Sequence, residues 1–176
     1  MTIDIRPATT SEAEAIAAVH VSSWRTAYRG LVDDATLDAL SVPSRTELWN
    51  RRLSAPRDDQ FVFVAEAAGD GIVGFVDAAR IEPSDDGFEA ELFAIYLLDS
   101  HRGRGLGSRL FRQAQTSVAA IGCRNLKLVV LADNPFRRFY DAMGGAVVAG
   151  GFADIGPQRL ETVTYGWKRL TNDEPL

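Results

Sequence analysis

The first third of the chain carries the apolar spacing of helices. Residues 2–6 alternate between apolar and polar and predict a short strand. Hydroxyl residues at positions 9–11 are typical N-caps, and the apolar positions after them recur every three or four residues as far as Tyr28. This spacing predicts one long helix that ends before Gly30. Two shorter helices are predicted over residues 34–40 and 44–53.

From residue 61 onward the apolar period changes to two. This period predicts strands, and short turns rich in glycine, aspartate and proline divide the first three into an antiparallel meander. The predicted elements are strands over 61–67, 72–81 and 88–98, a helix over 106–120, a strand over 126–131, a helix from just after Pro135 to Gly144, and strands over 146–153 and 160–168. The pattern therefore indicates an α/β (α+β) fold.

Length and composition place these elements in one domain. The chain has 176 residues, of which 46% are hydrophobic and 24% charged, as in soluble globular proteins. We expect a single domain over residues 1–170 and a short C-terminal tail over 171–176. No apolar run approaches the roughly 18 residues that cross a bilayer, and the N-terminus lacks the pattern of a signal peptide. We expect no membrane partner, and a cytoplasmic location is the default.

Charge and cysteine content argue against several classes of function. The net charge of −5 disfavours a nucleic-acid partner, because such proteins normally present a basic surface. A single cysteine cannot form an internal disulfide or a cysteine-built zinc site, and two histidines far apart in the chain argue against a histidine-built site. We expect no metal. An acidic total still permits a local basic cluster.

The strongest chemical signal is the segment R-G-R-G-L-G at residues 102–107, where a predicted strand ends and an amphipathic helix begins. Glycines let backbone amides approach a ligand closely, and the N-terminus of a helix favours an anion. Arg102 and Arg104 add positive charge and hydrogen-bond donors. The segment predicts a phosphate or pyrophosphate cradle. A glycine-rich turn with solvated arginines is the alternative.

Two common nucleotide motifs do not fit this segment. A dinucleotide fingerprint needs G-x-G-x-x-G, but counting from Gly103 the last position is Ser108. A P-loop needs Gly-Lys followed by Ser or Thr, which occurs nowhere. The segment does fit Q/R-x-x-G-x-G/A, and so it resembles the acetyl-CoA pyrophosphate loop of the GNAT superfamily of N-acetyltransferases.

Two further segments carry the same resemblance. The strand ELFAIYLL at 91–98 looks like the family's fourth strand, and NLKLVVLADNPFRRFYDAMGG at 125–145 looks like its fifth strand and the following helix. The resemblance spans about residues 61–168. It implies the GNAT fold, with a central mixed, mostly antiparallel sheet of six to seven strands. That sheet is splayed between strands four and five and flanked by helices.

The resemblance implies acetyl-CoA as the co-substrate. The main chain of Ile95, Tyr96 and Leu97 would pair with the pantetheine arm. A backbone amide near Leu97 would stabilise the reacting carbonyl oxygen, and Asn134 would contact the cofactor. Arg102 would add charge beside the pyrophosphate, and the amides around it would come from Gly103, Arg104, Gly105, Leu106, Gly107 and Ser108.

Acetyl transfer to an amine uses a proton donor for the leaving thiolate and a base for the amine. Tyr140 is the candidate donor, because a phenol can protonate a departing sulfur and the resemblance points to the same tyrosine. The alternative role for Tyr140 is packing of its helix on the sheet.

Glu91 is the candidate base, as the resemblance also suggests. It lies six residues before Leu97, which predicts both side chains on one face of the strand. Its apolar neighbours in sequence would raise its pKa. The alternative is a solvated or arginine-paired carboxylate, with water chains in place of one essential base.

The resemblance implies that the first helices cover the pocket that binds the acceptor amine. Trp24 and Tyr28, with Asp33 or Asp34, would form an aromatic wall with carboxylates, which favours a cation. The alternative places Trp24 in the core face of its helix and uses the two aspartates as caps of the next helix.

These observations predict an acetyl-CoA-dependent N-acetyltransferase that moves the acetyl group directly to a primary amine of a small molecule. No acyl-enzyme is expected, because the lone Cys123 lies outside the predicted cleft. A protein lysine or N-terminal acetyltransferase and a non-catalytic acyl-CoA-binding sensor are the alternatives. The family is often dimeric, so a homodimer is one expectation. The acidic excess outside the arginine segment favours a basic acceptor.

Overall fold

The computed structural model describes residues 2–55, 57–82 and 85–170, so the predicted tail over 171–176 lies outside the described part. The elements are β1 (Ile3–Pro7), α1 (Ala13–Ala27), α2 (Asp34–Ala39), α3 (Val42–Ser54), β2 (Gln60–Ala67), β3 (Gly71–Arg80), β4 (Ala90–Leu97), α4 (Leu106–Ala120), β5 (Leu126–Leu131), α5 (Arg137–Ala142), β6 (Ala146–Ile155) and β7 (Gln158–Trp167). The predicted elements are all present with small shifts at their ends. Within the described part, none of the helices has both the length and the apolar content to span a bilayer.

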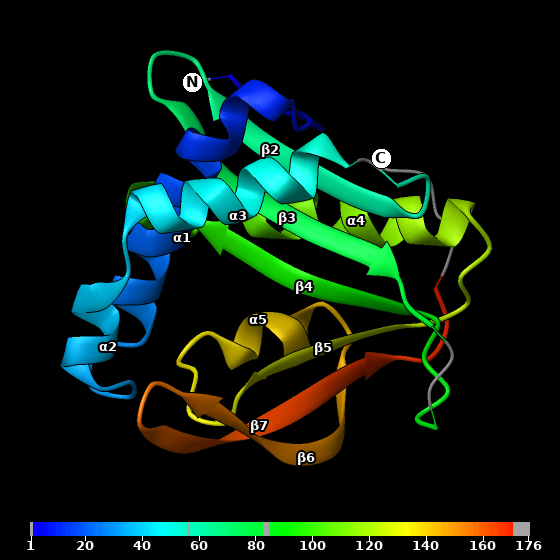
Figure 1. Ribbon diagram of the computed structural model, residues 1–176. Coiled ribbons are helices and arrows are strands. Elements are labelled where there is room, and N and C mark those ends of the chain that lie inside the picture. The colour runs from blue at the N-terminus through cyan, green and yellow to red at the C-terminus, as the bar shows by residue number, and fades with distance from the viewer. Residues whose placement is uncertain (1, 56, 83–84, 171–176) are drawn as a thin grey trace.

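One mixed sheet carries the fold, in the order β1-β2-β3-β4-β5-β7-β6. Strands β1 to β4 pair antiparallel in sequence order, and β5, β7 and β6 form a second antiparallel group. The two groups meet where β4 and β5 run parallel, and the ladder there consists of one residue pair, Glu91 with Lys127. Beyond this pair the two strands diverge (Figure 1). The predicted splay between strands four and five is confirmed.

Helices cover both faces of this sheet (Figure 1). α1 and α3 pack on one face, over a core that includes Ile16, Trp49 and Phe75. α4 and α5 pack on the other face, where Leu110 and Tyr140 belong to one buried cluster. The interior of β3 is buried throughout, as expected for a strand covered on both sides. The gap between β4 and β5 therefore lies between two helical layers.

A β-bulge in β4 changes which side chains share a face. The pairing of β3 with β4 slips by one residue next to Asp77, so that Phe93 is the extra residue. Leu92 and Leu97 consequently pack with the same α4-side core, although an unbroken strand would point them to opposite faces. Glu91 therefore points away from Leu97. The prediction that these two side chains share one face is wrong.

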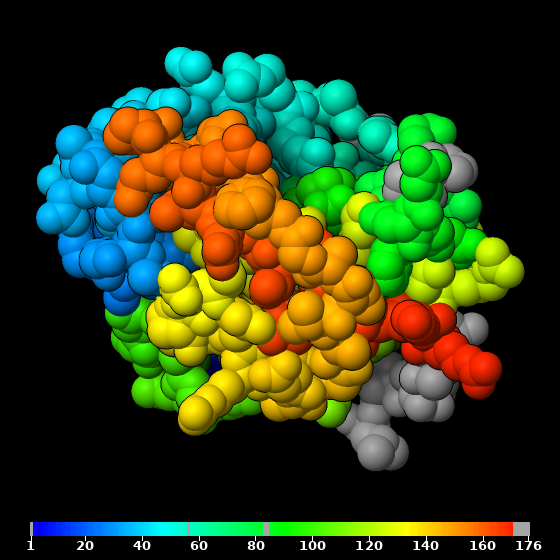
Figure 2. Space-filling view, turned by 90° about the horizontal axis from the view of Figure 1, so that it is seen from below, coloured from blue at the N-terminus to red at the C-terminus, as the bar shows by residue number. Residues whose placement is uncertain are grey.

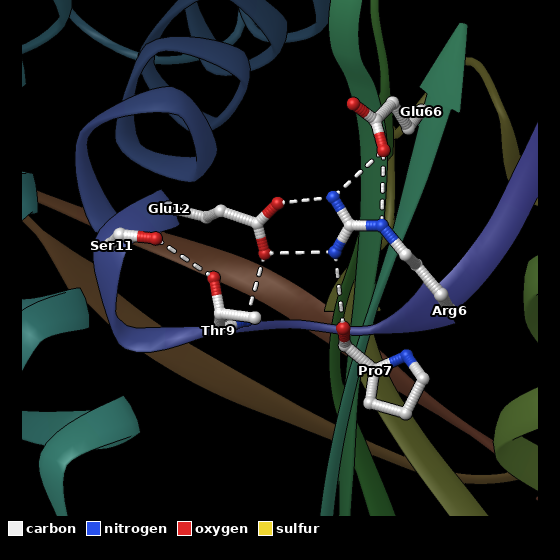
Figure 3. A network of polar contacts seen from close by, with 6 residues as sticks. All are labelled: Arg6, Pro7, Thr9, Ser11, Glu12 and Glu66. Atoms are coloured by element: carbon white, nitrogen blue, oxygen red, sulfur yellow. Dashed lines mark hydrogen bonds and ion pairs between the residues drawn. The ribbon is translucent and has the colours of Figure 1, made fainter.

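The start of α1 is joined to the sheet by Arg6 of β1 (Figure 3). The Arg6 guanidinium donates to Glu66 on β2 at 2.8 Å and to Glu12 at 3.1 Å. Glu12 in turn accepts from the Thr9 N–H at 2.7 Å, which completes a capping box for a 3₁₀ turn (Thr10–Glu12) that precedes α1. The predicted first helix is thus divided into a 3₁₀ turn and α1.

The turn between β6 and β7 contacts the loop between α1 and α2. The side-chain oxygen of Gln158 accepts from the Asp33 N–H at 2.6 Å. Gly156, with a φ of +56°, packs so closely against Thr36 that a Cβ would collide with its hydroxyl. Figure 2 shows the orange hairpin beside the blue N-terminal helices. This contact joins the second group of strands to the N-terminal helices on the side where β4 and β5 have separated.

Candidate active site

A cavity of about 540 Å³ occupies the gap between β4 and β5. It is bounded by the ends of both strands, the glycine segment, the start of α5 and the end of α1. Its lining residues are Ala27, Tyr28, Phe93, Ala94, Ile95, Tyr96, Leu97, Arg102, Gly103, Gly105, Gly107, Ser108, Leu128, Val129, Val130, Asn134, Phe136, Phe139 and Tyr140. Most of the site residues predicted from the sequence meet here.

The edge of β4 that faces β5 is free of strand pairing beyond the bulge. The Leu98 N–H donates to the Val73 carbonyl of β3 at 2.9 Å. Peptide groups alternate in direction along an antiparallel ladder, so those of Ile95 and Leu97 point the other way, into the gap. Ser23 donates to the Leu97 carbonyl at 3.2 Å, while the Leu97 N–H faces the gap. This edge has the geometry to pair with an extended ligand arm.

The glycine segment turns the chain from β4 into α4. Gly103 and Gly105 have φ angles of +74° and +75°, in the region that favours glycine. α4 has no side-chain cap, and the Arg109 N–H donates to the Gly105 carbonyl at 3.1 Å. The amides of Gly107 and Ser108 come before that bond, so they have no acceptor within the helix, and both residues line the cavity. This helix terminus favours an anion.

The other members of the predicted cradle differ in their positions. Arg102 lines the cavity, with its guanidinium 2.6 Å from the Asp99 carboxylate and 4.3 Å from the centre of the Phe136 ring. Arg104 is exposed and does not line the cavity, and the Leu106 side chain is buried in the α4-side core. Positive charge at the cavity therefore comes from Arg102.

Tyr140 reaches the cavity from α5. Its side chain is 7% exposed, and its ring packs against Phe139 with 5.4 Å between centroids. Within the described part of the chain its hydroxyl has no hydrogen-bond partner. Burial raises the pKa of this phenol above the ordinary value of 10.0, and the neighbouring hydroxyls of Tyr28 and Tyr165 raise it further. Tyr140 is therefore a neutral phenol with a proton to donate, and it also packs the helix.

Two hydrogen bonds connect α1 to β4 and to the turn before α5. The Trp24 indole donates to the Tyr96 hydroxyl at 2.9 Å, and the Asn134 amide donates to the Tyr28 hydroxyl at 3.1 Å. Asn134 also accepts from the Phe136 N–H at 2.8 Å. Tyr28, Tyr96 and Asn134 line the cavity, whereas Trp24 does not and packs against Tyr28 instead. Burial raises the pKa of the Tyr28 hydroxyl and of the Tyr96 hydroxyl.

The two aspartates considered for the acceptor side stabilise α2 instead. The Asp33 carboxylate accepts from the Thr36 N–H at 3.0 Å and caps that helix. Asp34 lies 2.8 Å from the Arg29 guanidinium on the surface. Neither residue lines the cavity. Of the two alternatives for these residues, the capping role is the one observed for Asp33.

Glu91 is half-buried beside the cavity and is not one of its lining residues. Burial raises the pKa of its carboxyl above the ordinary value of 4.5, and the charge of Lys127 lowers it in part. It lies at the start of β4, before the bulge, where it pairs with Lys127 of β5. The raised pKa suits a base, although Glu91 itself does not line the cavity.

Sequence reasoning missed two apolar residues that line the cavity, Phe93 and Val129, and the ion pair next to Phe93. Phe93 and Val129 are 45% and 46% exposed, although each lies in an apolar strand whose sequence predicts burial in the core. Arg52 of α3 donates to the buried Asp77 of β3 at 2.7 and 3.0 Å and lies 5.0 Å from the Phe93 ring centre. The available signal was one aspartate inside the apolar strand IVGFVDAARI.

Comparison with known proteins identifies the family. Residues 23–144 match the model of the Acetyltransferase (GNAT) family. The chain is 30% identical over 169 residues to YuaI of Bacillus subtilis, an uncharacterized N-acetyltransferase, and the match covers 96% of this chain and 95% of that protein.

Solved structures share the fold. The PaiA N-acetyltransferase of Thermoplasma acidophilum, in complex with coenzyme A, gives a TM-score of 0.71 at 22% identity over 92% of this chain and 98% of that one. YncA of Salmonella typhimurium, solved with acetyl-CoA, gives 0.70 at 16% identity over 100% of this chain and 97% of that one. Together with the splayed sheet and the glycine segment, these matches show that the chain belongs to the GNAT family of acetyltransferases.

Proposed function

We propose that the protein moves an acetyl group from acetyl-CoA directly to a primary amine of a small molecule. The observation that carries this proposal is one cavity that joins the free edge of β4, the uncapped N-terminus of α4 and the Tyr140 hydroxyl. PaiA and YncA were solved with coenzyme A and acetyl-CoA, which supports the same co-substrate here.

The residues present fit this co-substrate. Acetyl-CoA supplies an activated thioester on a long arm that carries a pyrophosphate. The first amides of α4, together with Arg102, favour that pyrophosphate. The edge of β4 at Ile95 would pair with the arm, and the Leu97 N–H would stabilise negative charge that develops on the acetyl carbonyl oxygen.

The chemistry requires one bond to form and one to break. The amine nitrogen bonds to the acetyl carbon, the carbon–sulfur bond breaks, and Tyr140 donates its proton to the departing sulfur. Cys123 is buried outside the cavity, and burial raises the pKa of its thiol, which disfavours the thiolate. Direct transfer is therefore favoured over an acyl-enzyme.

Glu91 is proposed to accept the amine proton through water. If so, replacing Glu91 by glutamine should lower kcat/KM by about 10²-fold. It should also remove the acidic limb of the pH profile, because activity needs Glu91 deprotonated and therefore falls as the pH drops through its raised pKa. Glu89→Gln is the matched control, since Glu89 pairs with Arg124 at the surface. If the pH profile of Glu91→Gln overlays that of the parent, water chains alone remove the proton from the amine.

Binding of the co-substrate is expected to depend on Gly105. Replacing it by valine forces a β-branched residue into the left-handed conformation, which costs about 1–2 kcal/mol and turns the following amides away. We expect coenzyme A to bind about tenfold or more weakly, as measured by calorimetric titration. Gly69→Val is the matched control, because Gly69 also has a positive φ but lies in the turn between β2 and β3. Equal affinities in the two variants would contradict the cradle.

The test of the proposed function is release of free thiol from acetyl-CoA in the presence of a panel of amines and peptides. Turnover with small primary amines supports the proposal. Turnover confined to peptides would indicate a protein acetyltransferase, and tight binding of acetyl-CoA without turnover on any acceptor would indicate a sensor.

A further inference from the structure

The cavity has two halves that lie on opposite faces of the sheet. Leu128 and Val130 belong to the α4-side core, so Val129 between them points to the α1 side. Ala94 and Tyr96 pack with the core under α1 and α3. The half on this side, called here the α1-side half, consists of Ala27, Tyr28, Phe93, Ala94, Tyr96 and Val129.

The α1-side half is the one left for the acceptor. The glycine segment and Tyr140 stand on the α4 side, where the pyrophosphate and the leaving sulfur are proposed to lie. Acetyl-CoA bound in this way would fill the α4-side half, so the space left for the amine to reach one face of the planar thioester carbonyl is the α1-side half. This step rests on the proposed function.

Chemically, the α1-side half is apolar, with two phenol hydroxyls. Among all the described lining residues of the cavity there is no aspartate or glutamate, and the charged side chain present is Arg102 at the other end. The carboxylates of the surroundings are engaged elsewhere: Asp33 caps α2, and Asp77 binds Arg52. Glu91 faces Lys127 across the ladder.

An ion pair borders this half, in which Arg52 binds the Asp77 carboxylate. The Arg52 guanidinium lies 5.0 Å from the centre of the Phe93 ring. A second ammonium group on an acceptor would lose its hydration here and would find no carboxylate among the described lining residues to replace it. The acidic side chains responsible for the net charge of −5 are not among the described lining residues of the cavity. They therefore do not determine which acceptor binds.

We propose that the acceptor is a primary monoamine with an apolar alkyl or aromatic body, and that polyamines and other multiply charged amines are poor substrates. Phe93 and Val129 contact the apolar body, and their exposure of 45% and 46% is surface kept free for it. The Tyr28 hydroxyl, which accepts from the Asn134 amide, provides the polar contact that orients the single amino group.

The test compares two amines that differ by one ammonium group. Hexylamine and 1,6-diaminohexane have the same chain length, and we expect kcat/KM for the monoamine to be higher by about tenfold or more. A diamine that is used as well as the monoamine would overturn this inference while leaving the proposed function in place. If neither amine nor any peptide releases thiol although coenzyme A binds, it is the proposed function that fails.

A charge placed in the α1-side half should change the preference. Val129→Asp supplies a carboxylate for the second ammonium, and we expect the ratio of kcat/KM for hexylamine to that for diaminohexane to fall by about tenfold. Val147→Asp is the matched control, since Val147 is 50% exposed on β6 outside the cavity, and its ratio should equal the parent's. Thermal melts of both variants verify that they fold. A ratio that stays at the parental value in Val129→Asp, or that shifts equally in both variants, would contradict the proposal.

Discussion

Replacing Tyr140 by phenylalanine is expected to lower kcat about 10²-fold and to leave the KM for acetyl-CoA unchanged. The phenol lines the cavity, its hydroxyl has no hydrogen-bond partner within the described part of the chain, and burial holds its pKa above the ordinary range. It is therefore protonated throughout neutral pH and can supply a proton that phenylalanine lacks. Steady-state kinetics with a saturating amine measure the effect.

Tyr165→Phe separates this role from aromatic packing. The two tyrosine rings lie 5.4 Å apart, but Tyr165 does not line the cavity and its hydroxyl donates to Asp141 at 2.9 Å. Its loss should cost about 1 kcal/mol of unfolding free energy and leave kcat at the parental value. If Tyr140→Phe also retains the parental kcat, Tyr140 serves only to pack α5 on the sheet.

Replacing Arg52 by methionine is expected to lower the free energy of unfolding by about 3–5 kcal/mol at neutral pH. The Asp77 side chain is 4% exposed and accepts two hydrogen bonds from Arg52, at 2.7 and 3.0 Å. Without them, the contact left to it among the described residues is a long one of 3.4 Å from the Gln60 amide. A buried carboxylate would then lack its counter-ion. Urea unfolding of the variant and the parent measures the difference.

The loss of unfolding free energy caused by Arg52→Met should be smaller at acidic pH. Burial raises the pKa of Asp77 above 3.8, although Arg52 and Gln60 act to lower it. A carboxyl whose pKa is raised by folding binds its proton more tightly in the folded state, so stability falls as the pH rises from the unfolded pKa to the folded pKa. Removing Arg52 raises the folded pKa further. The difference between variant and parent should therefore be smaller at about pH 5 than at about pH 8.

Two comparisons make this prediction specific. Arg57→Met removes a guanidinium that is 59% exposed and pairs with Asp59 at the surface, and it should cost less than about 1 kcal/mol. The double variant Arg52→Met with Asp77→Val replaces both charges by apolar groups and should recover much of the lost stability. Equal losses in Arg52→Met and Arg57→Met would contradict the role assigned to the buried pair.

The parts of the fold encoded locally could be predicted from the sequence. The glycine segment and the apolar stripe of α4 lie within one short stretch, because the positive φ angles of Gly103 and Gly105 and the spacing of Leu106 and Leu110 are local properties. The order of elements follows for the same reason. These local signals carried the family resemblance, which the comparisons confirm.

Features set by pairing between distant segments could not be predicted. The bulge at Phe93 arises from the register of β4 against β3, and it is the reason that the predicted face of Glu91 is wrong. The sequence around Asp33 suits a helix cap and a cation ligand equally well, and only the position of the Thr36 amide distinguishes them. The exposure of Val129 likewise depends on the divergence of β5 from β4.

The contact between Gln158 and the Asp33 amide joins a segment made early in synthesis to one made late. The two residues are 125 positions apart, and the chain leaves the ribosome N-terminus first. A nascent chain as far as residue 144, where the family match ends, already contains the glycine segment and Tyr140. It still lacks β7, the antiparallel partner of β5, and the turn that holds the α1–α2 loop. Competence for acetyl transfer is therefore expected only once almost the whole chain has been translated.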